Sequence, residues 1–270
     1  MTVAAWLAAN RDISRLDAEL IVANVLGSGR ARIIAFPEQV LAPAQLQVLD
    51  RLSERLRDCE PLAYLLECKE FYGLSLNVDK RVLIPRPETE LLVELTIEKI
   101  DPDAELLELG TGSGAIAIAL KKTYTNLRIT ATDVSKSALC VARDNAQRHA
   151  ANITFLESNW FSAVHGSFDC IVSNPPYIPN ADPHLKALRH EPRRALMSGP
   201  DGLAAIGAIT RHAGSFLRPG GILLVEHGCD QGQRVRELFV QNGLQAVEIH
   251  QDLAGLDRVT AGTRVKDIRV

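Results

Sequence analysis

The sequence predicts an α/β protein in which a mostly parallel sheet with helices on both faces follows a small helical domain. The length of 270 residues allows one large domain or two unequal ones. The composition, 46% hydrophobic and 23% charged, excludes disordered, collagen-like and disulfide-scaffold proteins. After Asp101, strand-like and helix-like segments alternate, and this pattern is typical of a parallel sheet.

The first sixty-odd residues predict helices. Ser14, with Asp17 three residues later, forms a helix start that resembles a capping box, and Gly27 supplies a stop. Pro43 suits the first position of the next helix. The apolar stripe of that helix consists of Leu46, Leu49, Leu52 and Leu56. No chemically reactive side chain lies among these leucines, so we expect them to form a core.

The pattern changes after this helical part. Leu74, Leu76 and Val78 alternate with polar residues, which is the period of a strand. We therefore expect residues 71–84 to form a hairpin that links the helical domain to the rest of the chain. A helix is expected to begin near Pro87, because proline fits the first turn of a helix.

From residue 101 onward the chain is expected to alternate between strands and helices. The expected strands cover residues 105–109, 128–133, 153–156, 168–173 and 221–226, and two further strands complete the count. The expected helices cover residues 115–122, 135–149, 203–216 and 232–241. The alternation predicts a sheet of about seven strands, mostly parallel, with helices packed on both faces.

Charge and cysteine content exclude several classes of protein. The formal net charge is −3, without a basic tail or block, which argues against nonspecific binding of nucleic acid. The five cysteines are scattered and lack zinc-like spacing, which favours free thiols and no metal site. The chain has no cationic signal segment at its start and no apolar run near the roughly 18 residues of a membrane span. We therefore expect a soluble cytoplasmic protein.

A glycine-rich loop follows the first strand of the predicted sheet. Glycines let a ligand approach the backbone, and the free N–H groups of the following helix favour an anionic group. Gly110, Gly112 and Ala115 also satisfy the GxGxxA pattern of dinucleotide-binding folds, so a nicotinamide or flavin cofactor stays an alternative. The residues of this loop are Gly110, Thr111, Gly112, Ser113 and Gly114.

Two carboxylates flank the loop in the predicted fold. Asp133 ends the second strand, where it can accept hydrogen bonds from the ribose hydroxyls of S-adenosylmethionine or of a dinucleotide. Its alternative role is the N-cap of the helix that begins near Ser135. Glu108 precedes the loop, as a contact for the amino group of a methionine moiety or as a solvated carboxylate at a strand end.

The four residues that decide the chemistry are Asn174, Pro175, Pro176 and Tyr177, directly after the strand 168–173. The side-chain oxygen of Asn174 and the carbonyl of Pro175 can accept both hydrogens of a planar NH₂ group and aim its nitrogen at a methyl group. Tyr177 would form a wall against that group. The alternative is a proline-rich turn. Together with the glycine loop and Asp133, the motif favours methyl transfer over hydride transfer.

These motifs resemble the HemK/PrmC family of protein-(glutamine-N5) methyltransferases, which modify class I peptide-chain release factors. The resemblance spans nearly the whole second part of the chain in family order. The matching segments are residues 84–90, 108–114, 173–177, Glu191-Pro192 with Ala195-Leu196, 201–203, 226–228 with Gln231-Gly232, and 257–259. The stretch Arg86-Pro87-Glu88-Thr89-Glu90 favours release-factor enzymes over glutamine methyltransferases of ribosomal proteins and amino-methyltransferases of nucleobases, which are the alternatives.

The resemblance implies a Rossmann-like, S-adenosylmethionine-dependent methyltransferase domain at residues 85–270. It also implies a helical substrate-recognition domain at 1–70 and a hairpin linker at 71–84. The expected partner is a class I release factor, bound by a monomer without stable nucleic-acid binding. The residues implied to line the cofactor site are Gly110, Thr111, Gly112, Ser113, Gly114, Asp133, Asn159, Trp160 and Asn174. The residues implied to hold the glutamine of a Gly-Gly-Gln loop are Asn174, Pro175, Pro176 and Tyr177.

Arg86, Trp160 and two departures from the family pattern bear on these expectations. Arg86 is expected to orient substrate or to pair with Glu88 or Glu90. Trp160 is either a wall for the adenine or a partly buried core residue. Asn159 stands where the family usually carries aspartate, so its bond to the adenine amino group should be weaker by about 1 kcal/mol. Glu67 stands where the family usually has glycine, which suggests a different turn there.

Overall fold

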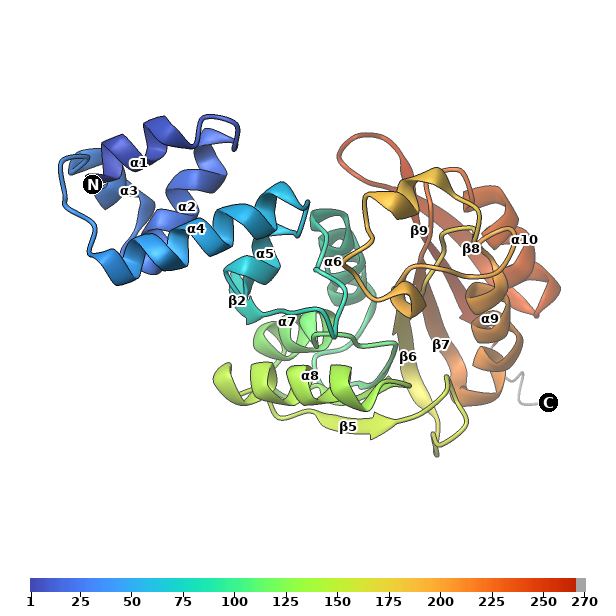
Figure 1. The fold of residues 1–270 in the computed structure, drawn as a ribbon. Helices are drawn as coiled ribbons and strands as arrows, with labels where there is room; N and C mark the ends of the chain where they lie inside the picture. Colours follow the sequence, from blue (N-terminus) through green and yellow to red (C-terminus); the bar gives the residue numbers. More distant parts are fainter. Residues whose placement is uncertain (266–270) are drawn as a thin grey trace, which may run out of the picture. The chain divides into compact units, whose positions relative to one another are not determined.

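The computed structural model describes residues 1–265 and divides into two compact units, one of residues 1–69 and one that begins at Glu70 (Figure 1). No helix within residues 1–265 is long and apolar enough to cross a membrane. The predicted domain boundaries at residues 70 and 84 stay a prediction. The functional motifs lie in the second unit.

The first unit is helical, as predicted. Ser14 caps its second helix by accepting a hydrogen bond from the N–H of Asp17, and Pro43 is the first residue of its longest helix. Its core surrounds Trp6, which is 1% exposed. The helices are α1 (Val3–Ala9), α2 (Arg15–Val25), α3 (Arg30–Ala35), α4 (Pro43–Arg57) and α5 (Leu62–Leu65).

Glu67 lies in the turn after α5 and has a φ of +53°, in the left-handed region that favours glycine. Glutamate thus adopts the conformation that glycine favours, and a turn different from that of the family stays a prediction. A side chain in this conformation costs about 1 kcal/mol or more, which the surrounding structure must offset.

The hairpin begins earlier than predicted. Its strands are β1 (Cys68–Phe71) and β2 (Leu74–Asn77), and Tyr72 and Gly73 form the turn, with φ values of +50° and +73°. Positive φ at both central residues suits the two-residue turn of a twisted hairpin. The first strand lacks the apolar alternation that made the second recognisable. After Asn77 the chain is irregular up to Pro87, so the predicted range 71–84 holds only part of the hairpin.

A seven-stranded sheet forms the centre of the second unit, in the order β5-β4-β3-β6-β7-β9-β8. All neighbouring strands pair in parallel except β9, which is antiparallel to both β7 and β8. This confirms the predicted Rossmann-like sheet. The strands are β3 (Glu105–Leu109), β4 (Arg128–Asp133), β5 (Thr154–Glu157), β6 (Phe168–Ser173), β7 (Leu217–Glu226), β8 (Leu244–Gln251) and β9 (Asp257–Arg264).

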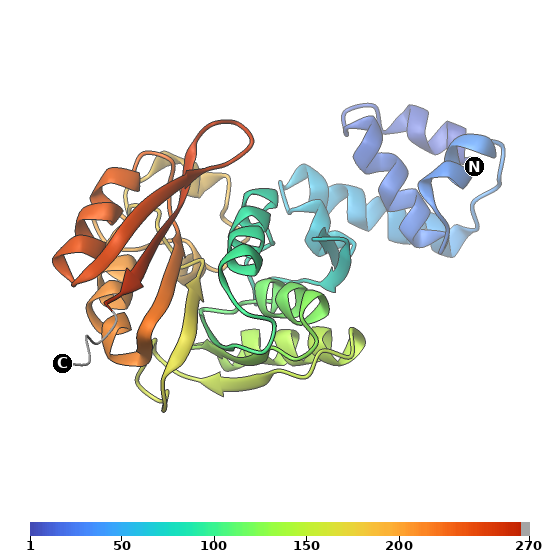
Figure 2. The same cartoon turned by 180° about the vertical axis from the view of Figure 1, so that it is seen from behind.

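Helices cover both faces of the sheet (Figures 1 and 2). Successive residues of a strand point to opposite faces, so Leu106 packs in the cluster with α6 and α7 while Leu107 packs in the cluster with α9 and α10. The five α-helices are α6 (Glu90–Lys99), α7 (Ala115–Thr123), α8 (Lys136–Arg148), α9 (Ala204–Phe216) and α10 (Gly232–Gln241). Short 3₁₀ turns are η1 (Pro87–Thr89), η2 (Pro183–Lys186) and η3 (Arg193–Ala195).

The predicted strand at 221–226 differs most from the structure, because β7 begins at Leu217. Pro219 and Gly220 suggest a break in the sequence, yet the strand passes through them. Its pairing with β6 shifts register between Phe168 and Cys170, and Gly220 has a φ of +83°. An irregularity in the ladder accommodates residues that a regular strand excludes.

The parallel register brings the ends of four strands to one edge. Leu109 pairs with Thr132 on one side and with Ser173 on the other, and Ser173 pairs with Val225. The residues that follow these positions therefore emerge side by side. In an open α/β sheet this carboxyl edge is where ligands bind.

Candidate active site

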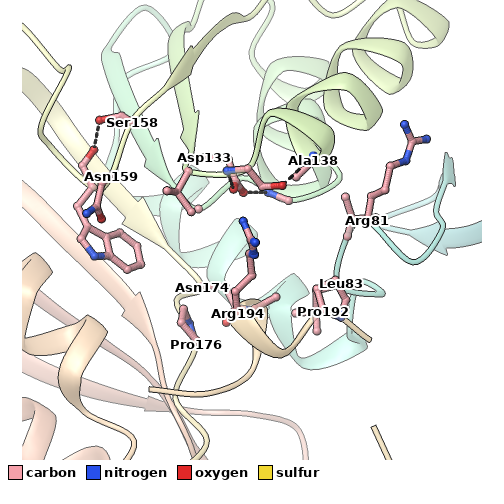
Figure 3. Close-up of a pocket in the computed structure, with 17 residues that line it drawn as sticks. Arg81, Leu83, Asp133, Ala138, Ser158, Asn159, Asn174, Pro176, Pro192 and Arg194 are labelled. Carbon is pink, nitrogen blue, oxygen red and sulfur yellow. Dashed lines mark hydrogen bonds between the residues drawn. The ribbon is translucent and has the colours of Figure 1, made fainter. Parts of the chain in front are cut away.

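A pocket opens at this carboxyl edge (Figure 3). It is called the edge pocket below. Several of its walls come from the predicted site residues, and others from residues that the sequence did not single out. The lining residues used below are Arg81, Gly110, Gly112, Asp133, Ser158, Asn159, Trp160, Asn174, Pro176 and Arg194.

The glycine loop joins β3 to α7 and forms one wall of the edge pocket. Gly110, Gly112 and Gly114 all have positive φ, between +56° and +83°. A Cβ at Gly112 would meet no atom within 4 Å, so the backbone there is open to a ligand. A Cβ at Gly114 would stand 3.1 Å from Ile118 Cδ1, so this glycine serves close packing instead. Gly110 and Gly112 line the pocket, and the other three loop residues support them.

Asp133 holds the loop in place from the end of β4. Its Oδ2 accepts from the N–H of Gly112 at 2.9 Å, and its Oδ1 accepts from the N–H of Ser135 at 2.8 Å. The N-cap of α8 is Ser135, whose hydroxyl accepts from Ala138, so the alternative N-cap role for Asp133 is wrong. Burial raises the pKa of the Asp133 carboxyl, although both backbone hydrogen bonds oppose the rise. The carboxylate therefore lies in the pocket wall with fixed orientation.

Asn159 and Trp160 form the opposite wall, after β5. Trp160 has a φ of +50°, and its ring passes 3.8 Å from the point where a Cβ of Gly110 would stand. The ring lines the pocket and also packs, partly buried, against the cluster that includes Phe161. The interpretation as a partly buried core residue is confirmed, and the role as a wall for adenine stays a prediction. Asn159 is exposed and borders the pocket near Ser158 (Figure 3). A flat aromatic face beside an amide suits a planar, hydrogen-bonding ring.

Glu108 is buried, only 1% exposed, so the interpretation as a solvated carboxylate is wrong. Its Oε2 accepts from the hydroxyl of Thr111 at 2.7 Å. Its Oε1 has no hydrogen-bond partner among the described residues. Burial raises the pKa of this carboxyl to about 8. The Thr111 hydroxyl and the backbone of Ala117 oppose this rise, so the carboxyl lies buried between the glycine loop and the start of α7.

Replacing Glu108 by glutamine should flatten the dependence of stability on pH. In the unfolded chain this carboxyl ionises near pH 4.5, whereas in the folded chain its pKa is about 8. Between these values the unfolded state binds fewer protons, so the free energy of unfolding falls by up to about 1.4 kcal/mol per pH unit. An amide mimics the protonated acid and removes this fall. We expect the difference in Tm between Glu108→Gln and wild type to grow by about 3 °C per pH unit between pH 5 and pH 8, in favour of the variant.

Melting curves at several pH values in this range, recorded without ligand, measure the difference. Glu157→Gln is the matched control, because Glu157 ends the neighbouring strand β5 and is exposed. Parallel Tm profiles for wild type and Glu108→Gln would contradict the raised pKa.

The loop of residues 174–177, called the Asn174 loop, follows β6. The hydroxyl of Ser173 donates to the carbonyl of Leu109 at 2.7 Å and ties the start of this loop to the start of the glycine loop. The Nδ2 of Asn174 donates to the hydroxyl oxygen of Thr89 at 3.0 Å, which leaves its Oδ1 free to accept. Asn174 and Pro176 line the edge pocket, and Pro175 is buried. Asn174 therefore borders the site with its amide nitrogen already engaged.

Tyr177, the last residue of this loop, does not line the edge pocket. It packs partly buried against the cluster that contains Leu203, and burial raises the pKa of its phenol. Its carbonyl accepts from the Nε2 of Gln231 at 2.9 Å. Tyr177 anchors one end of the Asn174 loop, and its role as a wall for substrate stays a prediction.

Arg86 forms an ion pair with Glu191. The predicted partners Glu88 and Glu90 are wrong, because the fold brings a distant acid closer than these neighbours. Glu191 is 4% exposed and also accepts from the N–H of Ile84 at 3.1 Å. The pair therefore joins two of the segments on which the family resemblance rests. A role of Arg86 in orienting substrate stays a prediction.

The sequence did not single out Arg194, which also lines the edge pocket. Its guanidinium points toward Asp133 and opposes the rise that burial causes in the pKa of that carboxyl (Figure 3). The neighbouring Glu191-Pro192 segment was the only signal in the sequence that could have pointed to it. Thr89 and Glu226 were likewise noticed only as parts of motifs, without a role.

The edge pocket thus offers contacts for several chemical groups at once. The open glycine backbone, the Asp133 carboxylate and the Trp160 face suit a nucleoside, and the carboxyl of Glu108 is buried behind the glycine loop. Within residues 1–265, no group of three or more His, Cys, Asp or Glu side chains is placed to hold a metal ion. These features fit S-adenosylmethionine, which combines an adenine ring, ribose hydroxyls and an amino-acid tail.

Comparison with known proteins finds methyltransferase relatives along nearly the whole chain. A family model for the methyltransferase small domain matches residues 87–199, and one for the PrmC N-terminal domain matches residues 3–66. The release factor glutamine methyltransferase of Coxiella burnetii is 44% identical over 254 residues, which cover 93% of this chain and 92% of that protein. Its counterpart from Neisseria gonorrhoeae is 40% identical, with 100% of both chains covered.

Among solved structures, a methyltransferase from Pyrococcus furiosus matches with a TM-score of 0.58 and 20% identity, over 80% of this chain and 99% of that one. At this identity the likeness shows the fold alone. The fold, the edge pocket and the two full-length relatives agree. The chain belongs to the release factor glutamine methyltransferase family.

Proposed function

We propose that this protein transfers a methyl group to the side-chain amide nitrogen, N5, of the glutamine in the Gly-Gly-Gln loop of a class I peptide-chain release factor. S-adenosylmethionine is the methyl donor. The observation that carries the proposal is the orientation of Asn174, whose Nδ2 is bound to Thr89 so that its Oδ1 can accept from an amide N–H. The printed names of the relatives support the substrate.

The cofactor would be held by the walls of the edge pocket. We assign the amino-acid tail to the glycine loop, the ribose hydroxyls to Asp133, and the adenine to Trp160 and Asn159. When bound, S-adenosylmethionine supplies a methyl group on a positively charged sulfur. The hydrogen bond from the adenine amino group to the neutral amide of Asn159 would be weaker by about 1 kcal/mol than one to a carboxylate.

The Asn174 loop would do the positioning. A glutamine amide is a poor nucleophile, since its nitrogen lone pair is conjugated with the carbonyl. Asn174 Oδ1 and the Pro175 carbonyl would each accept one N–H of this amide, and they would fix its plane relative to the methyl group. Such orientation of two reacting groups is worth several orders of magnitude in rate.

We further propose that the first unit recognises the release factor and that the protein acts as a monomer in the cytoplasm. The match of residues 3–66 to the PrmC N-terminal domain supports the first point. The net charge of −3, without a basic block, is consistent with a protein substrate.

The direct test uses radiolabelled S-adenosylmethionine with an unmodified release factor and locates the label by mass spectrometry of the peptides. Label on the Gly-Gly-Gln glutamine is expected, and a release factor with glutamate at that position should take up none. Parallel reactions contain ribosomal proteins or DNA and RNA oligonucleotides. Label only in those reactions, or no label while the cofactor binds, would contradict the proposal.

Replacing Asp133 by asparagine should weaken cofactor binding by about tenfold or more. The carboxylate accepts from the N–H of Gly112 and from that of Ser135, and hydrogen bonds to a charged acceptor contribute about 1.5 to 3 kcal/mol each. An amide presents its NH₂ to one of these donors and displaces the loop. Calorimetric titration with S-adenosylmethionine gives the Kd.

Asp252→Asn is the matched control for this change. Asp252 also accepts from two backbone N–H groups, those of Ala254 and Leu256, but in a turn outside the edge pocket. An equal loss of affinity in both variants, or none in Asp133→Asn, would argue against the assigned role.

A further inference from the structure

Two segments that do not line the edge pocket lie next to the Asn174 loop. Thr89 ends η1 and belongs to the Arg-Pro-Glu-Thr-Glu stretch. Glu226 ends β7, directly before His227 and Gly228. Both side chains are buried, 4% and 1% exposed, although both are polar. Burial of a polar side chain is costly unless it makes hydrogen bonds, so these two residues require an explanation.

The first link is the bond between Asn174 and Thr89. An asparagine amide has an acceptor oxygen on one side and a donor NH₂ on the other. The Nδ2 donates to the Thr89 hydroxyl at 3.0 Å, and a half turn of the amide would keep this bond only if the hydroxyl became the donor. As long as the Thr89 proton is directed elsewhere, the bond decides which of the two groups is presented on the other side. The group presented is the acceptor Oδ1.

The second link is Glu226, which faces Thr89. A hydroxyl can accept from one partner and donate to another, and the group that the Thr89 hydroxyl influences electrostatically is the Glu226 carboxyl. Hydrogen bonding from Thr89 and from Tyr177 lowers the pKa of this acid, although burial outweighs it and raises the pKa to about 7. The Oε2 of Glu226 has no hydrogen-bond partner among the described residues. An ionised Glu226 can only accept a hydrogen bond from the Thr89 hydroxyl. The oxygen of that hydroxyl is then left to accept from the Nδ2 of Asn174.

We propose that Thr89, backed by Glu226, is a positioning residue that fixes the amide of Asn174 with its oxygen toward the substrate. The chain of bonds runs from Asn174 Nδ2 to Thr89 Oγ1, and from the Thr89 hydroxyl to Glu226. Its effect is to select a nucleophile that donates N–H groups, such as a primary amide. The importance for catalysis rests on the proposed function, whereas the orientation of the Asn174 amide does not.

The variants that test the link differ in the hydroxyl of residue 89. Thr89→Val removes the hydroxyl at nearly constant shape, Thr89→Ser keeps it, and Thr89→Ala removes it without adding a methyl group. Thr96→Val is the matched control, because Thr96 is also fully buried but donates only to the carbonyl of Leu92 in its own helix α6. Two variants without the hydroxyl ensure that a folding fault in one of them does not decide the outcome.

The first readout needs no substrate. In protein labelled with ¹⁵N at asparagine side chains, the NH₂ signal of Asn174 is the one that disappears in Asn174→Asp. Loss of one hydrogen bond of about 1 to 1.5 kcal/mol should speed the exchange of these protons with water about tenfold. We expect this in Thr89→Val and Thr89→Ala, and wild-type exchange in Thr89→Ser and Thr96→Val.

The second readout is steady-state methylation of the release factor. We expect kcat to fall about tenfold or more in the two variants without the hydroxyl, with the cofactor Kd within about twofold and with rescue by serine. Wild-type exchange and wild-type kcat in both of these variants would overturn the proposal, as would failure of serine to restore them. If wild type labels no release factor while exchange responds as expected, the proposed function fails and the positioning of Asn174 stands.

Discussion

Asn174→Ala should lower kcat for glutamine methylation by about a hundred-fold or more. The variant removes the side-chain acceptor that, together with the Pro175 carbonyl, would hold the amide of the substrate. Misplacing a reacting group by about 1 Å can cost a hundred-fold in rate, and here one of two positioning contacts is lost entirely. Initial rates with saturating cofactor and varied release factor measure the change.

Binding of S-adenosylmethionine should be affected far less than turnover, because Gly112, Asp133 and Trp160 remain in place around the edge pocket. The Tm should fall by only a few degrees, since one hydrogen bond to Thr89 contributes about 1 kcal/mol. Asn152→Ala is the control, because Asn152 is exposed and precedes β5. A kcat near that of wild type in Asn174→Ala would refute the positioning role.

Gly202→Ala should be as damaging, although residue 202 does not line the edge pocket. Gly202 has a φ of +77°, and a Cβ there would stand 2.2 Å from the carbonyl oxygen of Tyr177 and 2.6 Å from Gln231 Nε2. The first of these atoms belongs to the backbone of the Asn174 loop and cannot swing aside. The loop must therefore move, and we expect a fall in kcat of about a hundred-fold together with a lower Tm by about 5 °C or more.

The control variant Gly255→Ala distinguishes the energetic cost of a positive φ from the effect of the clash. Gly255 has a φ of +75°, but a Cβ there would meet nothing within 4 Å. This control carries the same conformational strain of about 1 kcal/mol and leaves the Asn174 loop untouched. Rates and melting curves for the two variants should differ sharply. Equal behaviour of the two alanines would show that contact with Tyr177 has no consequence for catalysis.

Local patterns predicted most of the sheet. The strands β3, β4 and β6 begin and end at the predicted residues, because their buried apolar residues stand out from the polar turns beside them. Elements with weak patterns were harder to predict. The strand Cys68–Phe71 has no clear alternation, and β7 continues through Pro219 and Gly220 only because its partner β6 shifts register.

Much of the candidate site was predictable for a related reason. A glycine loop, an aspartate and an asparagine that each follow a parallel strand must emerge at one edge of the sheet, whatever their distance along the chain. Side-chain pairing was not predictable in this way. Thr89 meets Asn174, and Arg86 meets Glu191, only through the packing of η1 beside β6 and its loop. Sequence neighbours such as Glu88 were therefore the wrong partners to expect for Arg86.

The two tryptophans of this chain lie in different units and in different surroundings. Trp6 is enclosed in the helical core of the first unit, whereas the ring of Trp160 borders the edge pocket. The protein thus carries two intrinsic optical reporters. Fluorescence of Trp160 should change when a purine stacks on its ring, and that of Trp6 should change only when the first unit unfolds. In a Trp6→Phe variant, Trp160 would be the sole tryptophan, and its fluorescence would report only on the filling of the edge pocket.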